Sequence, residues 1–144
     1  GSEASLEALR SGLELVGTDQ PLVVVSVKAA PDISAVTGTG FAGGTLTAEA
    51  YEMEVATANE RAHDVVAEAR TELGIPAAEM VVLEGDAASA ICAYAEERDA
   101  HAIVMGTRGI SGLRRAVLGS VADHVVRHAP CTVVVSRDGL APED

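Results

Sequence analysis

Four short apolar runs, rich in Val and Ile, constrain the fold of this chain more than any other feature. They lie at residues 22–27 (LVVVSV), 80–83 (MVVL), 102–105 (AIVM) and 132–135 (TVVV). The runs show little alternation between apolar and polar residues, which is typical of strands that helices cover on both faces of a parallel sheet. Only 2% of the residues are aromatic, so the core must consist of Val, Leu, Ile, Ala and Met.

Helical patterns separate the four runs, because apolar residues recur there every three or four positions. We expect a helix over 2–16, with Ser2 as its N-cap and Gly17 at its end, and a long helix that ends at Gly74. A further helix follows Gly85, and Ser120 is the expected N-cap of the last one. The residues expected to face inward are Val55, Ala58, Ala62, Val65, Ala69 and Leu73 on the long helix, Ala88, Ile91, Cys92 and Ala95 on the next, and Val121, Ala122, Val125 and Val126 on the last.

Strands that alternate with helices predict the α/β class, with a doubly wound parallel sheet in a Rossmann-like three-layer sandwich. Ligands of such sheets bind beyond the carboxyl ends of the strands. We assign residues 1–137 to one domain and residues 138–144 to a flexible C-terminal tail. Residues 29–45 contain Pro31 and four glycines without periodicity, which predicts a mobile loop.

The formal charge of −12 disfavours nucleic acids and anionic membrane surfaces as partners. Arg114-Arg115 is the longest basic run, so we expect no nucleic-acid partner, and no apolar run is long enough to span a bilayer. No basic, apolar leader opens the sequence, so a cytoplasmic location is the expectation. Cys92 and Cys131 lie among Ala, Ile and Val, which favours core packing over redox chemistry.

The residues between the third apolar run and the last helix carry the chemistry. Gly106-Thr107-Arg108-Gly109 follows the run, and Gly119-Ser120 opens the last helix after nine further residues. Glycines let a backbone curl around phosphate oxygens, and the start of a helix offers unpaired N–H groups and the positive end of its dipole. Arg108, with Arg114 and Arg115, can add charge-assisted hydrogen bonds. The alternative interpretation is a set of tight turns with a simple helix cap.

The same residues resemble the nucleotide-binding subgroup of the universal stress protein (UspA-like) family. Its members carry Gly, two residues, Gly, nine residues, and then Gly followed by Ser or Thr, and this sequence has Gly106, Gly109, Gly119 and Ser120 at those positions. Residues 103–135 resemble the family's C-terminal third, and residues 1–10 resemble its first loop and helix. The resemblance covers nearly the whole chain, with residues 29–44 the most divergent part.

The resemblance implies an adenine-nucleotide site at one edge of the sheet. The implied ligand is ATP, with or without Mg²⁺, and cyclic AMP is the alternative. By the resemblance, the triphosphate contacts the backbone around Gly109 and also Gly119, Ser120 and Val121. The ribose lies near Gly106. The adenine lies between Val27 and Met105, with Gly85 close by.

The resemblance also bears on the sheet and its edges. The family's five-stranded sheet begins with a strand that ends in an adenine-reading Asp, just before the Gly-Ser matched here by Gly1-Ser2. This sequence begins at that Gly, so we expect a gap between the strands that end at Val27 and Met105, or its filling by another chain. The resemblance further implies a homodimer through strand Thr132–Ser136, and an exposed β-branched edge is prone to such pairing.

Three further patterns favour binding over catalysis. Residues 38–43 match G-x-G-x-x-G, but no strand directly precedes them, so we interpret them as part of the loop. The four His residues show no metal-ligand spacing with the cysteines. Ser120, Asp123 and His124 have the residue types of a hydrolase triad, but they lie within about one helical turn. We therefore expect no catalytic residue and no metal site.

Together, these expectations predict a stress or signalling module that binds an adenine nucleotide and hydrolyses it slowly at most. Two alternatives stay open, a cyclic-nucleotide binder and a protein-interaction module of the same fold that needs no nucleotide.

Overall fold

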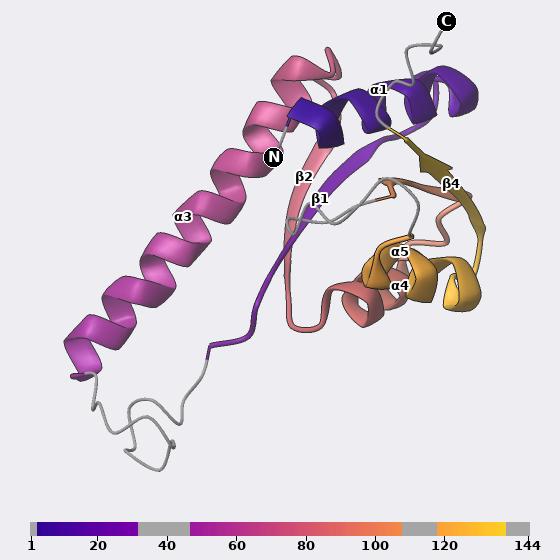
Figure 1. The fold of residues 1–144 in the computed structure, drawn as a ribbon. Coiled ribbons are helices and arrows are strands. Elements are labelled where there is room, and N and C mark those ends of the chain that lie inside the picture. Colours follow the sequence, from indigo (N-terminus) through magenta and orange to yellow (C-terminus); the bar gives the residue numbers. More distant parts are fainter. Residues whose placement is uncertain (1–2, 32–46, 108–117, 138–144) are drawn as a thin grey trace, which may run out of the picture.

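The computed structural model describes residues 3–31, 47–107 and 118–137, along which helices and strands alternate (Figure 1). The predicted α/β class is confirmed, and each of the four apolar runs forms a strand. Most of the expected loop at 29–45, the expected cap Ser2 and the expected tail at 138–144 lie outside the described residues. The elements are α1 (Glu3–Val16), β1 (Val23–Lys28), α3 (Ala48–Glu72), β2 (Glu79–Glu84), α4 (Ala87–Glu97), β3 (Ala102–Gly106), α5 (Ser120–His128) and β4 (Thr132–Ser136).

The strands form two parallel pairs. β1 pairs with β2, with Val23 opposite Glu79, and β3 pairs with β4, with Ala102 opposite Thr132. Within the described residues, no hydrogen-bonded ladder joins β1 to β3. The expected gap between the strands that end at Val27 and Met105 is therefore confirmed.

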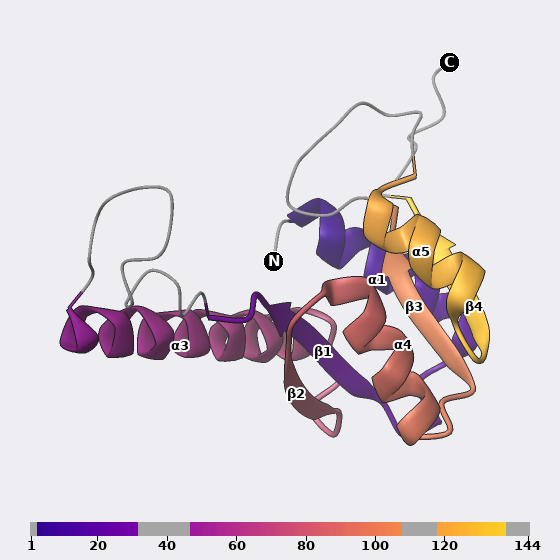
Figure 2. The same ribbon diagram turned by 90° about the horizontal axis from the view of Figure 1, so that it is seen from below.

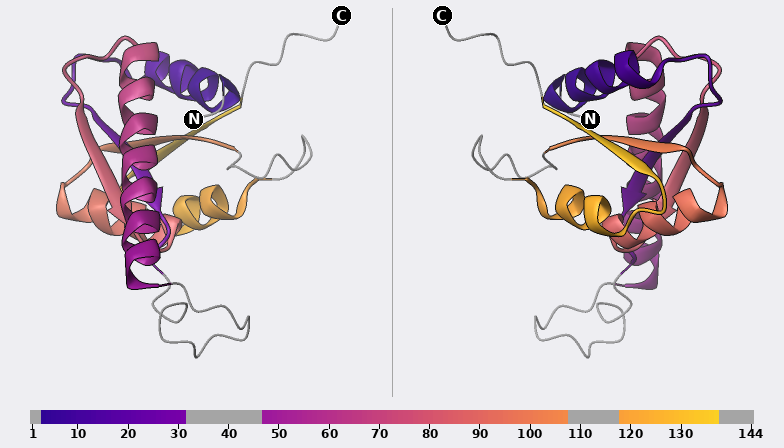
Figure 3. Two further views of the ribbon diagram at one scale, coloured as in Figure 1. Left: turned by 90° about the vertical axis from the view of Figure 1, so that its left-hand side faces the viewer. Right: turned by 90° about the vertical axis from the view of Figure 1, so that its right-hand side faces the viewer.

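Helices lie on both faces of the strands. α3 packs on β1 and β2, and α1 packs on β3 and β4. α4 contacts β1 and β2 and also packs against α5. Figure 3 shows α1 on one side of the strands and α4 and α5 on the other, which is the predicted three-layer arrangement. The N-terminal half of α3 extends beyond the strands (Figures 1 and 2).

The core consists mainly of alanines that helices and their ends contribute. The buried apolar residues are Ala8, Ala62, Val66, Ala69, Ile75, Ala78, Ala88, Ala95, Ala122 and Val125. No residue of the four strands belongs to this set, and every residue of β1 and of β3 is only half-buried. The expectation that these strands are fully covered is wrong, because no strand among the described residues pairs with the second edge of β1 or of β3.

Two of the expected helix faces need correction. On α3 the residue with the least exposure is Val66, at 1%, whereas Val65 is half-buried and Ala58 is exposed. The inward stripe is Ala62, Val66 and Ala69, at spacings of four and three, so Val65 lies on its flank. On α5 the expected inward residue Val126 is 49% exposed, because Ala122 and Val125 occupy the buried stripe.

Glycines position two helices as the sequence predicts, and a third glycine sets a packing distance. α1 ends at Gly17 (φ +79°) and α3 is followed by Gly74 (φ +65°), both in the left-handed region that favours glycine. Gly12 lies on the face of α1 that packs on β3 and β4. A Cβ at this position would overlap Cγ1 of Val104 and lie 3.1 Å from Oγ of Ser136, so α1 approaches these strands closely because residue 12 has no side chain.

Candidate functional site

The start of α5 is the first component of the site. Gly119 is the N-cap of this helix, with φ −62° and ψ 153°, and no side chain caps the helix. The expectation that Ser120 is the N-cap is wrong, because Ser120 is already the first helical residue. The amide of Asp123 donates to the carbonyl oxygen of Gly119 at 2.9 Å and so begins the helical ladder.

Three backbone amides at this helix start have no partner in the part of the chain that the structure describes. In an α-helix the N–H groups of the first turn have no intrahelical acceptor. The amide of Gly119 is satisfied from outside, since it donates to the carbonyl oxygen of Thr107 at 2.8 Å. The amides of Ser120, Val121 and Ala122 have no acceptor among the described residues. They form a donor group at the positive end of the helix dipole, which is the arrangement that binds phosphate oxygens.

The carboxyl end of strand β3 lies beside this donor group. The amide of Thr107 donates to the carbonyl oxygen of Ser136 at 3.0 Å, which continues the ladder between β3 and β4 by one residue. The carbonyl of Thr107 in turn holds Gly119. Thr107 and Gly119 are therefore held beside each other at the carboxyl end of β3. The predicted contact residues Arg108 and Gly109 lie outside the described residues.

The residues expected to flank the base and ribose lie at the ends of β1 and β3. Val27 is opposite Leu83, and Met105 and Gly106 are opposite Val135 and Ser136. Val27, Met105 and Gly106 are half-buried, so each keeps surface that a ligand can cover. The structure brings Gly106, Gly119, Ser120 and Val121 together around Thr107. Val27 lies on the other strand pair.

The start of α4 adds a carboxylate that the sequence analysis did not single out. Asp86 is the N-cap, and its Oδ1 accepts from the amide of Ser89 at 3.0 Å. The hydrogen bonds from the backbone and hydroxyl of Ser89 lower the pKa of Asp86, and the nearby imidazole of His124 lowers it further. The start of α4 therefore lies near His124 of α5, in agreement with the packing of α4 against α5. An Asp directly before an apolar helix, three residues ahead of Ser89, is a capping signal that the sequence offered.

A salt bridge joins the carboxyl ends of β1 and β2. Lys28 pairs with Glu84, and its side chain is 16% exposed. Gly85 follows with φ +116°, and its amide donates to the carbonyl oxygen of Lys28 at 2.9 Å. The sequence analysis missed this pair because only the strand register places Lys28 and Glu84 opposite each other.

The side chains of the alternative hydrolase and metal patterns interact with other groups in the structure. The carboxylate of Asp123 accepts from Arg127 at 3.1 Å. The rings of His124 and His128 lie 4.2 Å apart, and Nδ1 of His128 lies 2.9 Å from the carbonyl oxygen of His124. Across the described ranges, no group of three or more His, Cys, Asp or Glu side chains is placed to hold a metal ion. Burial raises the pKa of the Cys92 and Cys131 thiols, which keeps them protonated.

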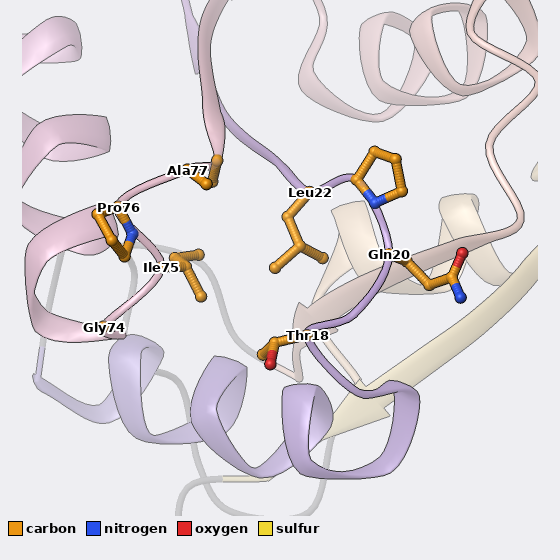
Figure 4. A pocket seen from close by; sticks show the side chains of 9 residues that line it. Thr18, Gln20, Leu22, Gly74, Ile75, Pro76 and Ala77 are labelled. Carbon is orange, nitrogen blue, oxygen red and sulfur yellow. The ribbon is translucent and has the colours of Figure 1, made fainter.

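A small cavity lies away from these residues, at the opposite ends of β1 and β2. Its volume is about 210 Å³, and Thr18, Leu22 and Ile75 are among its lining residues (Figure 4). No charged side chain lines it, so it offers nothing that would hold a phosphate.

None of the helices in the part of the chain that the structure describes is long and apolar enough to cross a membrane.

This chain is similar in sequence to proteins of one family. The family model described as the universal stress protein family matches residues 1–137. A universal stress protein of Methanocaldococcus jannaschii is 48% identical over 56 residues, which are 39% of this chain and 33% of that protein. One from Thermus aquaticus is 42% identical over 78 residues, which are 54% of this chain and 57% of that protein. The matched segments thus span from one third to somewhat more than half of these relatives.

Solved structures share the fold at low sequence identity. The universal stress protein UspA from Lactobacillus plantarum has a TM-score of 0.70 at 19% identity, and the match covers 94% of this chain and 92% of that one. A universal stress protein described in complex with cAMP has a TM-score of 0.60 at 18% identity, with 96% and 90% covered.

Proposed function

The chain belongs to the universal stress protein family, and we propose that it binds an adenine nucleotide, with ATP as the preferred ligand. In this proposal it is a stress or signalling module whose nucleotide state is read by a partner. Cyclic AMP is the alternative ligand.

The observation that carries the proposal is the group of amides at Ser120, Val121 and Ala122, which have no acceptor within the described ranges. A Ser, Thr, Asp or Asn cap would satisfy at least one of these donors through its side chain. Here the cap is a glycine without a side chain, so the donors stay available. A protein with a formal charge of −12 needs such local donors to attract an anion.

The glycine spacing supports a nucleotide over a free anion. Gly106 directly precedes Thr107 in the sequence, and Gly119 binds the carbonyl of Thr107. The second glycine of the pattern, Gly109, is two positions after Thr107. Val27 and Met105 supply apolar surface for a base at the same edge. A protein of this fold is described in complex with cAMP, which shows that the fold can accommodate an adenine nucleotide in that relative.

The proposal is binding rather than turnover, with slow hydrolysis at most. Efficient phosphoryl transfer requires a bound metal and a base that positions the attacking water. Two carboxylates at the starts of α4 and α5 are already engaged, Asp86 as a helix cap and Asp123 with Arg127. Any Mg²⁺ would therefore be held mainly by the phosphate oxygens.

We further propose that the chain forms a homodimer through β4. Ser136 directs its carbonyl to β3, so Val133 and Val135, which alternate with it, direct their N–H and C=O groups to the outer edge. Such an edge of β-branched residues pairs readily with a second copy. Light scattering of the wild type and of Val135→Pro tests this, since loss of the outer N–H should shift the protein to a monomer. A wild type that stays monomeric at high concentration contradicts the dimer.

Calorimetric titration with ATP, ADP, AMP and cAMP tests the binding proposal. Gly119 has φ −62°, which any residue adopts, so Gly119→Val adds bulk beside the donor group without backbone strain. We expect this variant to lose ATP binding, while Leu118→Val, one position earlier, retains it. Absence of heat with all four nucleotides would instead leave the nucleotide-independent interaction module.

A further inference from the structure

Two histidines lie one helical turn apart on α5, outside the residues that the nucleotide proposal uses. His124 and His128 are four positions apart, and residues four apart on an α-helix lie on the same face. Their ring centroids are 4.2 Å apart, and the ring planes are inclined by 30°. The two imidazoles are therefore direct neighbours on this helix.

The ring of His128 is oriented so that one nitrogen stays free. Its Nδ1 lies 2.9 Å from the carbonyl oxygen of His124. A carbonyl oxygen can only accept a hydrogen bond, so Nδ1 carries the proton and the lone pair of the neutral ring is on Nε2. Histidines that bind metal ions almost always donate their other ring N–H to a carbonyl, a carboxylate or water in this way. The Nε2 atom of His128 is therefore prepared to bind a metal ion.

The ring of His124 can complete such a site. Its ring nitrogens have no hydrogen-bond partner among the described residues. A tetrahedral ion with metal–nitrogen bonds of about 2.0–2.1 Å holds two of its nitrogens about 3.3 Å apart. The two rings already have a comparable spacing. Rotation of the His124 ring about χ2, whose energy wells are broad, can therefore bring a nitrogen to the ion without moving His128.

The charges around the pair favour a bound cation. The carboxylate of Asp86, at the start of α4, lies near the imidazole of His124. His128 is the last residue of α5, where the negative end of the helix dipole lies. The adjacent positive side chain of Arg127 is paired with Asp123 at 3.1 Å. Because His128 is exposed and His124 is half-buried, an ion from solvent can reach both rings and keep water as further ligands.

The helix dipole by itself explains less of this arrangement. A cationic residue at the carboxyl end of a helix is stabilising, which accounts for a single His at position 128. It does not account for a second imidazole 4.2 Å away, because two protonated rings at this distance repel each other. A metal ion binds both rings in their neutral form, so it makes use of the pair.

We propose that His124 and His128 form a surface site for one divalent transition-metal ion, with two imidazole nitrogens as its protein ligands and water at its remaining positions. Imidazole suits Zn²⁺, Ni²⁺ and Cu²⁺, whereas Mg²⁺ and Ca²⁺ prefer oxygen ligands. No metal site was expected from the sequence, because the histidines have no ligand spacing with the cysteines. A site of two imidazoles needs no cysteine, and it does not depend on nucleotide binding.

Calorimetric titration with Ni²⁺ tests the site on the 144-residue chain without an affinity tag. Nucleotide is left out, because its phosphates would chelate the ion, and the pH is kept about one unit above the ordinary His pKa of about 6.5. His128→Ala should weaken Ni²⁺ binding about 100-fold or more, since the second ligand of a chelate acts at a high effective concentration. The matched control is His63→Ala, which removes an exposed histidine of α3 and should leave the affinity unchanged.

NMR of the imidazole nitrogens identifies the ligands in the wild type, independently of how any variant folds. On addition of Zn²⁺, the ring nitrogens of His124 and His128 should shift, whereas those of His63 and His101 should not. Equal shifts at all four histidines would overturn the proposal. So would a His128→Ala variant that binds Ni²⁺ as tightly as His63→Ala, or a wild type that binds Mg²⁺ as tightly as Ni²⁺.

Discussion

The amide of Gly119 donates a hydrogen bond of 2.8 Å to the carbonyl oxygen of Thr107, and this contact places the start of α5 at the carboxyl end of β3. The amide of Gly119 is thereby engaged. The donors that remain for a phosphate are those of Ser120, Val121 and Ala122, and Gly119 itself contributes the absence of a Cβ beside them.

Ser120→Pro should therefore weaken ATP binding without loss of the fold. Proline is tolerated as the first helical residue, and the ψ of 153° at Gly119 suits the residue before a proline. The substitution removes one amide donor, and a hydrogen bond to a charged group contributes about 1.5–3 kcal/mol, so we expect roughly 10- to 100-fold weaker binding by calorimetry. Ser120→Ala, which keeps the amide, is the control and should lose less. Equal losses in the two variants would indicate that the hydroxyl rather than the amide binds phosphate.

Gly12→Ala should destabilise the protein although alanine favours helices. Helix propensity alone would stabilise the variant by up to about 1 kcal/mol. The added Cβ overlaps Cγ1 of Val104, however, and overpacking of this kind costs about 1–3 kcal/mol. We expect a net loss in the free energy of unfolding, measured with urea, whereas Ser11→Ala on the exposed side of α1 should be neutral or slightly stabilising. A Gly12→Ala variant as stable as Ser11→Ala would show that α1 can move away from β3.

The sequence located the elements well because apolar periodicity and glycine positions are local signals. The run 102–105 forms β3 with one residue added, and Gly17 and Gly74 end their helices as expected. On α3, Ala62 and Ala69 face inward as expected, but Val66 takes the place of Val65, since the two valines are chemically alike and only packing against β1 and β2 distinguishes them. The Lys28–Glu84 salt bridge depends on strand register, and the proximity of His124 to Asp86 depends on the packing of α4 against α5; no local pattern contains either.

Asp86 should make stability depend on pH in the acidic range. Its folded-state pKa lies below the ordinary value, chiefly through the hydrogen bonds from Ser89. A depressed carboxyl pKa contributes stability that is present above the unfolded-state pKa of about 3.9 and is lost as the pH falls through the folded-state value. Asp86→Asn keeps a capping side chain but does not titrate. In thermal melts the wild type should lose more stability than Asp86→Asn as the pH falls below about 4. Parallel pH profiles would indicate that the Ser89 contact does not depend on the charge of Asp86.

Two prolines on β1 should have unequal effects, because neighbouring residues of this strand face different edges. The carbonyl oxygens of Leu22 and Lys28 accept hydrogen bonds from the β2 side, so the backbone of Val24, which alternates in step with them, also faces β2. Val24→Pro therefore removes a ladder donor and leaves a carbonyl of β2 unpaired. The backbone of Val25 faces the opposite edge of β1, so Val25→Pro removes a donor that has no partner among the described residues. Both variants lose a half-buried Val, which matches them in side-chain cost. We expect the free energy of unfolding to fall further in Val24→Pro, by about 1–3 kcal/mol, which is the cost of an unsatisfied backbone group. The measurement is urea unfolding at a protein concentration where light scattering finds no association. If Val25→Pro is as damaging as Val24→Pro, the opposite edge of β1 is already paired in solution.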